Sequence, residues 1–408
     1  MLMIWSMRVA TAAWVFVGEK GCRSGNDVLW LLTSPTSQVS RVPQRANALH
    51  NANKLKLGLF SLNADGGIAI TKVPERWQAG WPDIVDVARM ADRAGFEFIL
   101  PIARWKGFGG ELDVRTLCFE TFTFAAALGA ITEQITIFST VHVPIVHPVF
   151  AAKALVTVDH VSGGRAGLNI VAGWNQGEFD MFGHALAEHD RRYEQGLEWF
   201  DVMTRIFTAK DRFDYAGEFY QLTEVIGKPP PVQTPRPLTM SAASSPAGRA
   251  FAMKTSDLLV TVLGVAGEGL APVRALSAQR RAEGRPLQVI ATTHVVCRET
   301  DSEAEDYYRH YAVDHADTEA VDYHMKMSRR NRQLDTDQIF NERKRYAGGL
   351  SSHPLIGRPE TIVDELVRLQ ADGIDGVTLS FVNFRDELPF FIERVLPLLE
   401  QAGLRVGR

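Results

Sequence analysis

The sequence contains few cysteines, and they are too far apart to suggest a shared structural role. Its 408 residues include three, Cys22, Cys118 and Cys297, with no C-x-x-C pair among them. Disulfide frameworks and zinc knots rely on closely spaced cysteines. Neither is indicated, so we expect no metal site and a reducing, cytoplasmic location.

Long runs of one charge sign or of apolar residues are also missing. The chain has 44 Lys and Arg against 48 Asp and Glu, a net charge of −4, which favours neither a nucleic-acid surface nor a polybasic membrane tail. The apolar start, MLMIWSMRVATAAWVFVG, is split by Arg8 and is too short to span a membrane. The polar residues after it show no periodicity. We interpret residues 1–53 as a disordered N-terminal extension or the result of a mis-set translation start.

Common nucleotide-binding and hydrolase motifs are absent as well. The glycine-rich segment WKGFGG, residues 105–110, fits neither a P-loop nor the G-x-G-x-x-G dinucleotide fingerprint. There is no G-x-S-x-G nucleophile elbow. His310, His315 and His324 lack metal-site spacing, so we expect their side chains to be solvated.

From Lys54 onward the sequence alternates regularly between apolar strands and amphipathic helices. In segment 81–96, for example, apolar side chains recur on one helical face, Pro82 suits the first turn and Gly95 suits the end. Strands are predicted at residues 54–62, 96–102, 135–141, 166–173, 237–242, 257–263, 288–297 and 376–381. Eight such strand–helix units indicate parallel pairing with right-handed crossovers.

The fold class predicted from this pattern is α/β, a (β/α)8 TIM barrel over residues 54–405. An open doubly wound sheet is the alternative. Two insertions interrupt the alternation, a β-hairpin around residues 211–222 and an irregular stretch around residues 317–349.

Several polar and aromatic side chains fall at the C-terminal ends of the predicted strands, where barrel enzymes carry their chemistry. They are Thr140, His142, Asn169, Trp174 and Ser245. Asn169 interrupts an apolar strand, and a buried amide needs a protein or ligand partner. Ser245 before Pro246 suits a helix start whose free amides favour an anion. Thr140 as an ordinary strand residue, Trp174 as core packing and Ser245 as an ordinary cap remain open, and these residues alone predict a barrel enzyme with an anion site.

Two longer segments resemble a known family. TVDHVSGGRAGLNIVAGWNQGEFDMFG, residues 157–183, and EHDRRYEQGLEWFDVMTRIF, residues 188–207, are similar to the bacterial luciferase-like FMN-dependent monooxygenases. The resemblance covers about residues 55–404 and is greatest to the pyrimidine oxygenase of uracil degradation and to dimethylsulfone monooxygenase. It implies a barrel that binds reduced FMN made by a separate NAD(P)H-dependent flavin reductase, and that lets it react with O2 to form a flavin peroxide.

The resemblance also implies which residues hold the flavin and the oxygen. The flavin contacts correspond to Ala103, Arg104, Asn169, Glu178, Arg192, Tyr193 and Ser245. The oxygen pocket corresponds to Thr140, Asn169 and Trp174. In this interpretation the flavin phosphate lies at the helix after Ser245, Thr140 and Asn169 offer hydrogen bonds where negative charge develops, and Trp174 helps to exclude water.

The resemblance is weakest on the substrate side. His142 and His147, in VHVPIVHP, could each bind substrate or act as acid or base near neutral pH; His142 is our catalytic candidate. His294 corresponds to a histidine of alkanesulfonate monooxygenase. The Arg and Tyr that accompany it there are replaced here by Thr292 and Val382, which disfavours an alkanesulfonate.

The predicted function is a two-component, FMNH2- and O2-dependent monooxygenase that oxidises or opens a small nitrogen heterocycle or cyclic amide. A sulfone or other organosulfur monooxygenase that oxidises or cleaves C–S bonds is the nearest alternative. A deazaflavin-dependent dehydrogenase and a non-catalytic flavin-binding protein are further alternatives. The expected partners are a flavin reductase, bound transiently, a small-molecule substrate and further copies of the chain in a homo-oligomer, with no nucleic acid and no membrane.

Overall fold

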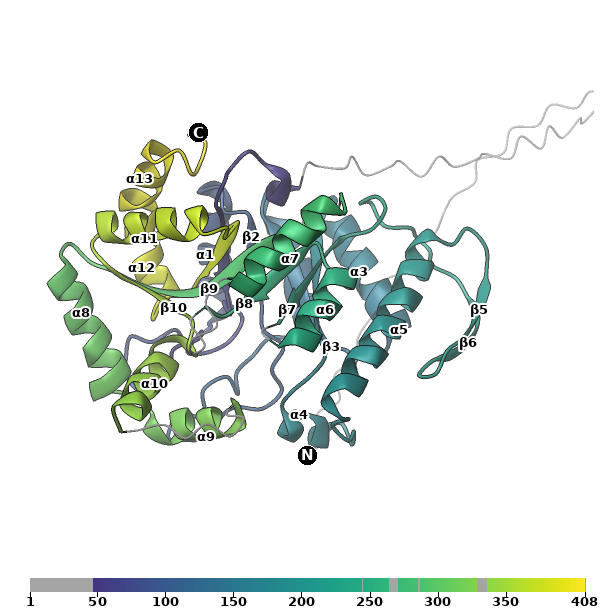
Figure 1. The fold of residues 1–408 in the computed structure, drawn as a ribbon, viewed down its shortest axis with the longest axis horizontal. Coiled ribbons are helices and arrows are strands. Elements are labelled where there is room, and N and C mark those ends of the chain that lie inside the picture. The colour runs from purple at the N-terminus through teal and green to yellow at the C-terminus, as the bar shows by residue number, and fades with distance from the viewer. Residues whose placement is uncertain (1–46, 244, 264–270, 285–286, 329–335, 408) are drawn as a thin grey trace, which may run out of the picture. The chain divides into compact units, whose positions relative to one another are not determined.

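Eight parallel strands close into a barrel in the computed structural model (Figure 1). The structure describes residues 47–243, 245–263, 271–284, 287–328 and 336–407. Around the barrel the strands are β1 (Lys56–Phe60), β2 (Phe98–Leu100), β3 (Thr136–His142), β4 (Ala166–Val171), β7 (Leu238–Ala242), β8 (Leu258–Thr261), β9 (Gln288–Cys297) and β11 (Gly376–Leu379). Because β11 pairs with β1, the ring is closed. This confirms the predicted (β/α)8 barrel and excludes the open doubly wound sheet.

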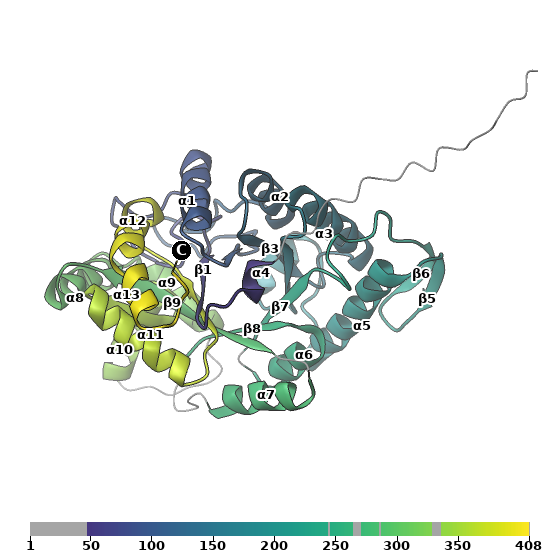
Figure 2. The ribbon, with the colours of Figure 1, turned by 90° about the horizontal axis from the view of Figure 1, so that it is seen from above.

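Helices follow the strands and surround the barrel (Figure 2). They are α1 (Trp81–Arg93), α2 (Thr121–Ile131), α3 (Pro148–Ser162), α4 (Gln176–Met181), α5 (His189–Thr208), α6 (Pro246–Thr255), α7 (Ala271–Ala282), α8 (Asp301–Arg309), α9 (Thr318–Ser328), α10 (Thr336–Gly349), α11 (Pro359–Ala371), α12 (Phe384–Arg394) and α13 (Leu396–Gln401). A short 3-10 helix, η1 (Ala48–His50), precedes β1, and a short π-helix, η2 (His310–Asp314), follows α8.

Helix α1 shows how the sequence pattern produces this outer layer. Pro82 occupies the first turn, where a missing backbone N–H costs nothing. Ile84 and Val87 lie on the buried face, and burial of such side chains contributes roughly 1.5–3 kcal/mol each. Gly95, at φ +79°, takes the left-handed conformation just after the helix. The predicted helix and its buried face are therefore confirmed.

Side chains alternate along each strand between the barrel interior and the helical layer. In β3, Ile137 packs with the outer core, whereas Phe138 points inside. The interior cluster also contains Leu49, Phe98, Leu100, Met240, Leu258, Val260 and Ile290. The same alternation directs Thr140 and His142 to the interior side of β3. Strand phase therefore decides which polar residues reach the centre of the barrel.

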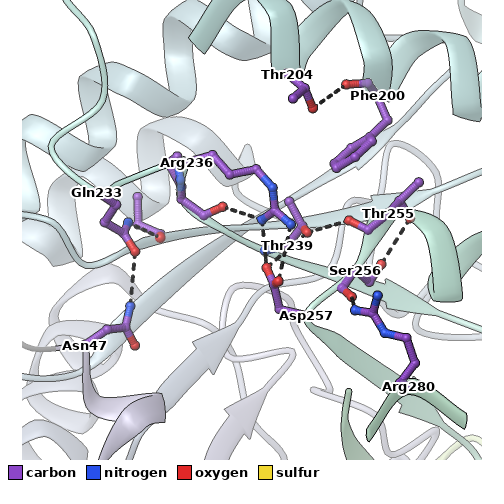
Figure 3. Close-up of polar contacts among 12 residues, drawn as sticks. Asn47, Phe200, Thr204, Gln233, Arg236, Thr239, Thr255, Ser256, Asp257 and Arg280 are labelled. Carbon is purple, nitrogen blue, oxygen red and sulfur yellow. Dashed lines mark hydrogen bonds and ion pairs between the residues drawn. The ribbon is translucent and has the colours of Figure 1, made fainter. Parts of the chain in front are cut away.

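Polar contacts close the end of the barrel where β7 and β8 begin (Figure 3). Asp257 accepts hydrogen bonds from Arg236 Nη1 at 2.7 Å and from the Thr239 amide at 2.9 Å. Gln233 donates to the Ala166 carbonyl at 2.8 Å. These bonds satisfy polar groups where the strands begin. The active sites of such barrels lie at the opposite end, where the strands finish.

The hairpin insertion is confirmed, as β5 (Phe213–Ala216) pairs with β6 (Gln221–Val225). The prediction of an irregular stretch at residues 317–349 is wrong, because its described residues form α9 and α10. The buried face of α9 includes Ala320, Val321, His324 and Met325. This is helical spacing, which the sequence prediction did not identify. A further strand, β10 (His353–Gly357), pairs with β9 outside the ring.

The N-terminal region is described only from Asn47. The interpretation of residues 1–53 as an extension falls mostly on residues 1–46, which lie outside the described residues, and for these it stays a prediction. Residues 47–53 are instead part of the fold, because they include η1 and place Leu49 in the interior cluster. Within the described ranges, no helix is long and apolar enough to cross a membrane.

Candidate active site

Thr140 and Asn169 face each other on adjacent strands, near the C-terminal ends of β3 and β4. They are register partners, and Asn169 Nδ2 donates to Thr140 Oγ1 at 3.2 Å. Thr140 Oγ1 in turn donates to the Pro101 carbonyl at 2.5 Å. Asn169 is almost fully buried, yet its Oδ1 has no hydrogen-bond partner among the described residues. A buried amide left half-satisfied is costly, so this atom indicates a place for a ligand.

A buried ion pair lies beside this strand pair. Arg104, in the loop after β2, donates through Nη1 to Glu178 Oε1 at 2.8 Å, and the Trp105 amide donates to the same oxygen at 3.0 Å. Glu178 stands in the first turn of α4 and is fully buried. The Arg104 guanidinium also lies over the Trp174 ring, with Cζ 4.7 Å from the centroid. The loop after β2 and the loop after β4 are thus joined by charge and by an aromatic contact.

His142 completes the buried group. Its Nδ1 lies 3.8 Å from Glu178 Oε2, and neither atom has a hydrogen-bond partner among the described residues. Burial, with a smaller effect from the Arg104 charge, lowers the pKa of His142 to about 3. The imidazole is therefore neutral near pH 7. A neutral imidazole has one donor and one acceptor nitrogen, so His142 keeps an acceptor for a ligand.

A second group lies at the start of α6. Ser245 caps this helix by accepting a hydrogen bond from the Gly248 amide at 3.1 Å. A Cβ added at Gly248 would lie 2.8 Å from Tyr193 Oη and 3.2 Å from Ser245 Oγ. The tyrosine hydroxyl, the serine hydroxyl and the helix start are therefore adjacent, with no room for a larger residue at position 248. Hydroxyl donors at a helix N-terminus suit a phosphate.

Arg192 and Ala103, the other predicted flavin contacts, lie next to residues of the strand-end group. Arg192, in the first turn of α5, donates through Nη1 to the Gly173 carbonyl, directly before Trp174. Ala103 directly precedes Arg104 and is half-buried. The neighbouring Ile102 is held by Asn63, whose side chain exchanges hydrogen bonds of 2.8 and 2.9 Å with its carbonyl and amide.

The two remaining predicted histidines have different surroundings. His147 is exposed and caps α3, where its Nδ1 accepts from the Val149 amide at 3.3 Å. Nothing in the described contacts joins it to the site, so its substrate role stays a prediction without support from the geometry. His294 is buried on β9 and bonds through Nδ1 to Ser352 Oγ at 2.9 Å, and its Nε2 has no described partner. Burial lowers the pKa of His294 to about 3.

Sequence reasoning missed three side chains that form a cluster with Arg104 and Trp174. Phe108 and Arg115 come from the loop after β2, and His324 comes from α9. The expectation of a solvated His324 is wrong: it is buried, its ring lies 4.7 Å from Phe108 and 5.7 Å from Trp174, and burial lowers its pKa to about 3. No local signal identifies these residues, because they meet only through the folding of the insertion.

Comparison with known proteins decides the family. The family profile described as luciferase-like monooxygenase matches residues 55–376. The chain belongs to the luciferase-like monooxygenase family. An FMNH2-dependent dimethylsulfone monooxygenase of Pseudomonas putida is 30% identical over 358 residues, which is 85% of this chain and 96% of the relative. The pyrimidine monooxygenase RutA of Acinetobacter baylyi is 26% identical, over 85% of this chain and 95% of the relative.

Solved structures agree with the barrel of this luciferase-like monooxygenase. The crystal structure of DmoA from Hyphomicrobium sulfonivorans has a TM-score of 0.73 at 19% identity, covering 86% of this chain and 89% of that one. Riboflavin lyase RcaE, solved with modified FMN and riboflavin, has a TM-score of 0.75 at 22% identity, covering 86% and 93%. At these identities the likeness establishes the fold alone.

The arrangement of the predicted cofactor residues fits a flavin mononucleotide chemically. Its phosphate could lie at the start of α6, beside Tyr193 and Ser245. Its polar ring edge could meet Asn169, whose Oδ1 lacks a partner among the described residues. A ligand with a phosphate and a polar ring needs hydrogen-bond donors for the phosphate and a polar partner for the ring. The start of α6 offers the donors, and the Asn169 Oδ1 offers the partner.

Proposed function

We propose that this luciferase-like monooxygenase is a two-component enzyme that uses reduced FMN from a separate flavin reductase. One atom of O2 enters a small uncharged substrate and the other leaves as water. The observation that carries the proposal is the Thr140–Asn169 pair, with its unpaired Oδ1 at the C-terminal ends of β3 and β4. Relatives named FMNH2-dependent dimethylsulfone monooxygenase and pyrimidine monooxygenase support the choice of cofactor.

In this proposal the residues around α6 position the cofactor. Tyr193 and Ser245 stand at the helix N-terminus, where backbone N–H groups and the helix dipole favour the phosphate. Reduced FMN supplies the two electrons for activation of O2. The protein contributes binding, orientation and electrostatics.

Thr140 and Asn169 act at the reacting end. The Pro101 carbonyl accepts a hydrogen bond from the Thr140 hydroxyl, which holds the Thr140 side chain in one orientation. The Asn169 amide is held on one side by Thr140, and its donors and acceptor are fixed in advance of ligand binding. Fixed dipoles of this kind stabilise developing charge at little reorganisation cost.

The Arg104–Glu178 pair and Trp174 form a wall on the outer side of the site. Their buried contact joins two loops and excludes water from the region next to Asn169. A neutral His142 has one acceptor nitrogen, which suits a substrate N–H group. This observation favours a cyclic amide or nitrogen heterocycle as substrate.

A small sulfone is the second candidate substrate, and the higher identity to the dimethylsulfone enzymes favours it. The test supplies photoreduced FMN and 18O2 to the full chain with uracil, 2-pyrrolidinone, 2-hydroxypyridine or dimethylsulfone in turn. Incorporation of one label into a ring product supports the first substrate class, and label in a C–S oxidation product supports the second. FMN binding without label in any product would contradict the proposed activity for this panel.

The proposal includes a transient reductase and a homo-oligomer. A reductase that supplies free FMNH2 across a dialysis membrane is expected to sustain turnover. Analytical ultracentrifugation should give a mass above that of one chain, 45.3 kDa. A monomer at working concentration would contradict the oligomer.

A further inference from the structure

Arg115 is a buried arginine, and the described residues do not use all of its guanidinium donors. Its side chain is 1% exposed, and its Nε donates to the Gly67 carbonyl at 2.9 Å. Its Nη2 is buried and has no hydrogen-bond partner among the described residues. A buried charged donor without a partner destabilises the folded state, so such an atom indicates a place for a ligand.

Two other buried arginines, Arg165 and Arg405, do not share this feature. Arg165 donates through all three guanidinium nitrogens, to five oxygens at 2.8–3.0 Å. Arg405 donates through both terminal nitrogens, to Leu55, Glu97 and Gly95. These two arginines hold loops and termini in place. Arg115 is anchored at only one nitrogen and leaves a terminal donor open, which distinguishes it from a structural arginine.

Arg115 belongs to a cluster next to the candidate active site. We call Arg104, Phe108, Arg115, Trp174 and His324 the Arg115 subsite. Arg115 Cζ lies 5.0 Å from the Phe108 ring centroid, and Arg104 Cζ lies 5.7 Å from the same centroid and 4.7 Å from that of Trp174. The His324 ring contacts both aromatic rings. Helix α9, which carries His324, lies toward the same end of the molecule as α4 (Figure 1).

The charges around the subsite balance. Arg104 is paired with Glu178 at 2.8 Å. Burial and then the Arg104 charge lower the pKa of Arg115 to about 9, so it stays a cation near pH 7. Asp65 acts in the opposite direction, and its carboxylate accepts a hydrogen bond from the Arg115 amide at 2.7 Å. His324 is neutral, because burial lowers its pKa to about 3. Two cations therefore face two carboxylates, and the open Nη2 offers a strong donor without an excess positive charge.

We propose that the Arg115 subsite recognises the substrate of the proposed monooxygenase through an acceptor oxygen on an uncharged group, a sulfonyl or an amide carbonyl. Arg115 Nη2 donates to that oxygen, while Phe108 and Trp174 contact the apolar part of the molecule. The inference rests on the proposed function, since it names the chemical class that the enzyme oxidises. It also makes Arg115 a specificity-determining residue that lies outside the predicted flavin contacts.

The test measures binding to the full chain saturated with oxidised FMN, by isothermal titration calorimetry. Dimethylsulfone and 2-pyrrolidinone probe the two sources of an acceptor oxygen. Dimethyl sulfide and pyrrolidine lack that oxygen, and methanesulfonate carries it on an anion. We expect at least one of the first two to bind about 10-fold or more tightly than its oxygen-free counterpart and than methanesulfonate.

Variants locate the effect. Arg115→Gln should weaken binding of the oxygen-bearing probe about 10- to 100-fold, because a charge-assisted hydrogen bond is lost. Arg115→Lys keeps the charge but not the planar donor geometry and should give an intermediate loss. The exposed Arg212→Gln is the matched control and should bind as the parent does. FMN affinity should be unchanged in all three variants.

Equal affinity of the parent protein for the oxygen-bearing and oxygen-free probes, including no measurable binding of either, overturns the proposal even if Arg115→Gln does not fold. Unchanged binding in a folded Arg115→Gln also overturns it, as does a preference for methanesulfonate. The proposed function fails separately, through absence of 18O in products while probe binding and its dependence on Arg115 persist.

Discussion

Replacement of Asn169 by leucine should raise the stability of the flavin-free chain and lower its oxygenation activity. Asn169 makes one side-chain hydrogen bond, from Nδ2 to Thr140 Oγ1 at 3.2 Å, and buries an unpaired Oδ1. Loss of a neutral hydrogen bond costs about 0.5–1.5 kcal/mol, whereas removal of an unsatisfied buried acceptor returns about 1–3 kcal/mol. Leucine has nearly the same shape. The flavin-free Asn169→Leu variant should therefore be about 1 kcal/mol more stable than the parent chain.

The same substitution should lower oxygenation by about 100- to 1,000-fold, which is the usual effect of losing one preorganised polar group at a reacting centre. Thr140→Val is the informative comparison, because Thr140 Oγ1 both donates to the Pro101 carbonyl and accepts from Asn169. Its removal leaves two buried groups unpaired and should destabilise the chain by about 2–4 kcal/mol. Both variants lose activity, but the sign of the stability change differs.

Ser139→Ala is the control, since Ser139 precedes Thr140 on β3 and bonds outside the ring to the Thr121 carbonyl at 3.4 Å. It should keep full activity and lose less than about 1 kcal/mol of stability. Calorimetric melting of the flavin-free chains and 18O incorporation with photoreduced FMN measure the two effects. A destabilised Asn169→Leu, or one with full oxygenation, would refute the reasoning.

Further predictions concern pH, the phosphate end and the buried ion pair. His142, His294 and His324 have pKa values lowered to about 3 in the folded state, so below about pH 6.5 only the unfolded chain gains their protons. The free energy of unfolding should therefore fall as the pH drops from about 6 to 4, by about 1.4 kcal/mol per pH unit for each histidine. Chemical denaturation at several pH values measures this slope, and His294→Gln should reduce it by about 1.4 kcal/mol per pH unit. Gly248→Ala should weaken FMN binding at least about 10-fold in flavin fluorescence titrations, because its Cβ would crowd Tyr193 Oη at 2.8 Å; unchanged affinity would place the phosphate elsewhere. Glu178→Gln should lower the free energy of unfolding, measured by urea denaturation, by about 3 kcal/mol, because it leaves the Arg104 cation without its carboxylate. Adding Arg104→Met to this variant should recover part of the loss, because it removes the unpaired cation.

Much of the barrel could be predicted from local patterns. Strand 166–171 is an apolar run with one amide, and α1 repeats apolar residues at helical spacing. Such patterns depend on nearest neighbours along the chain, so they survive without knowledge of the fold. Asn169 stood out because a polar residue in a buried strand violates its local pattern. Its pairing with Thr140 and the location of both near strand ends follow from the register of a parallel barrel.

The Arg115 subsite could not be predicted in this way. Arg115 and His324 are more than 200 positions apart, and neither interrupts a clear pattern. In sequence His324 cannot be told from a solvated histidine, because the burial of a face of α9 depends on what that face packs against. His324 becomes buried only when α9 packs over Phe108 and Trp174. His147 shows the opposite case, since a suggestive histidine is used as a helix cap.

By itself, then, the sequence determined the order of strands and helices, the phase that turns Thr140 and Asn169 inward, and the family resemblance of the segment around Trp174. Only the tertiary structure decided which charges are paired, which buried donors remain open and which insertion covers the barrel end. The physical reason is that helix and strand formation follow short-range periodicity, whereas the burial, pKa and pairing of a side chain depend on groups brought together across the whole chain.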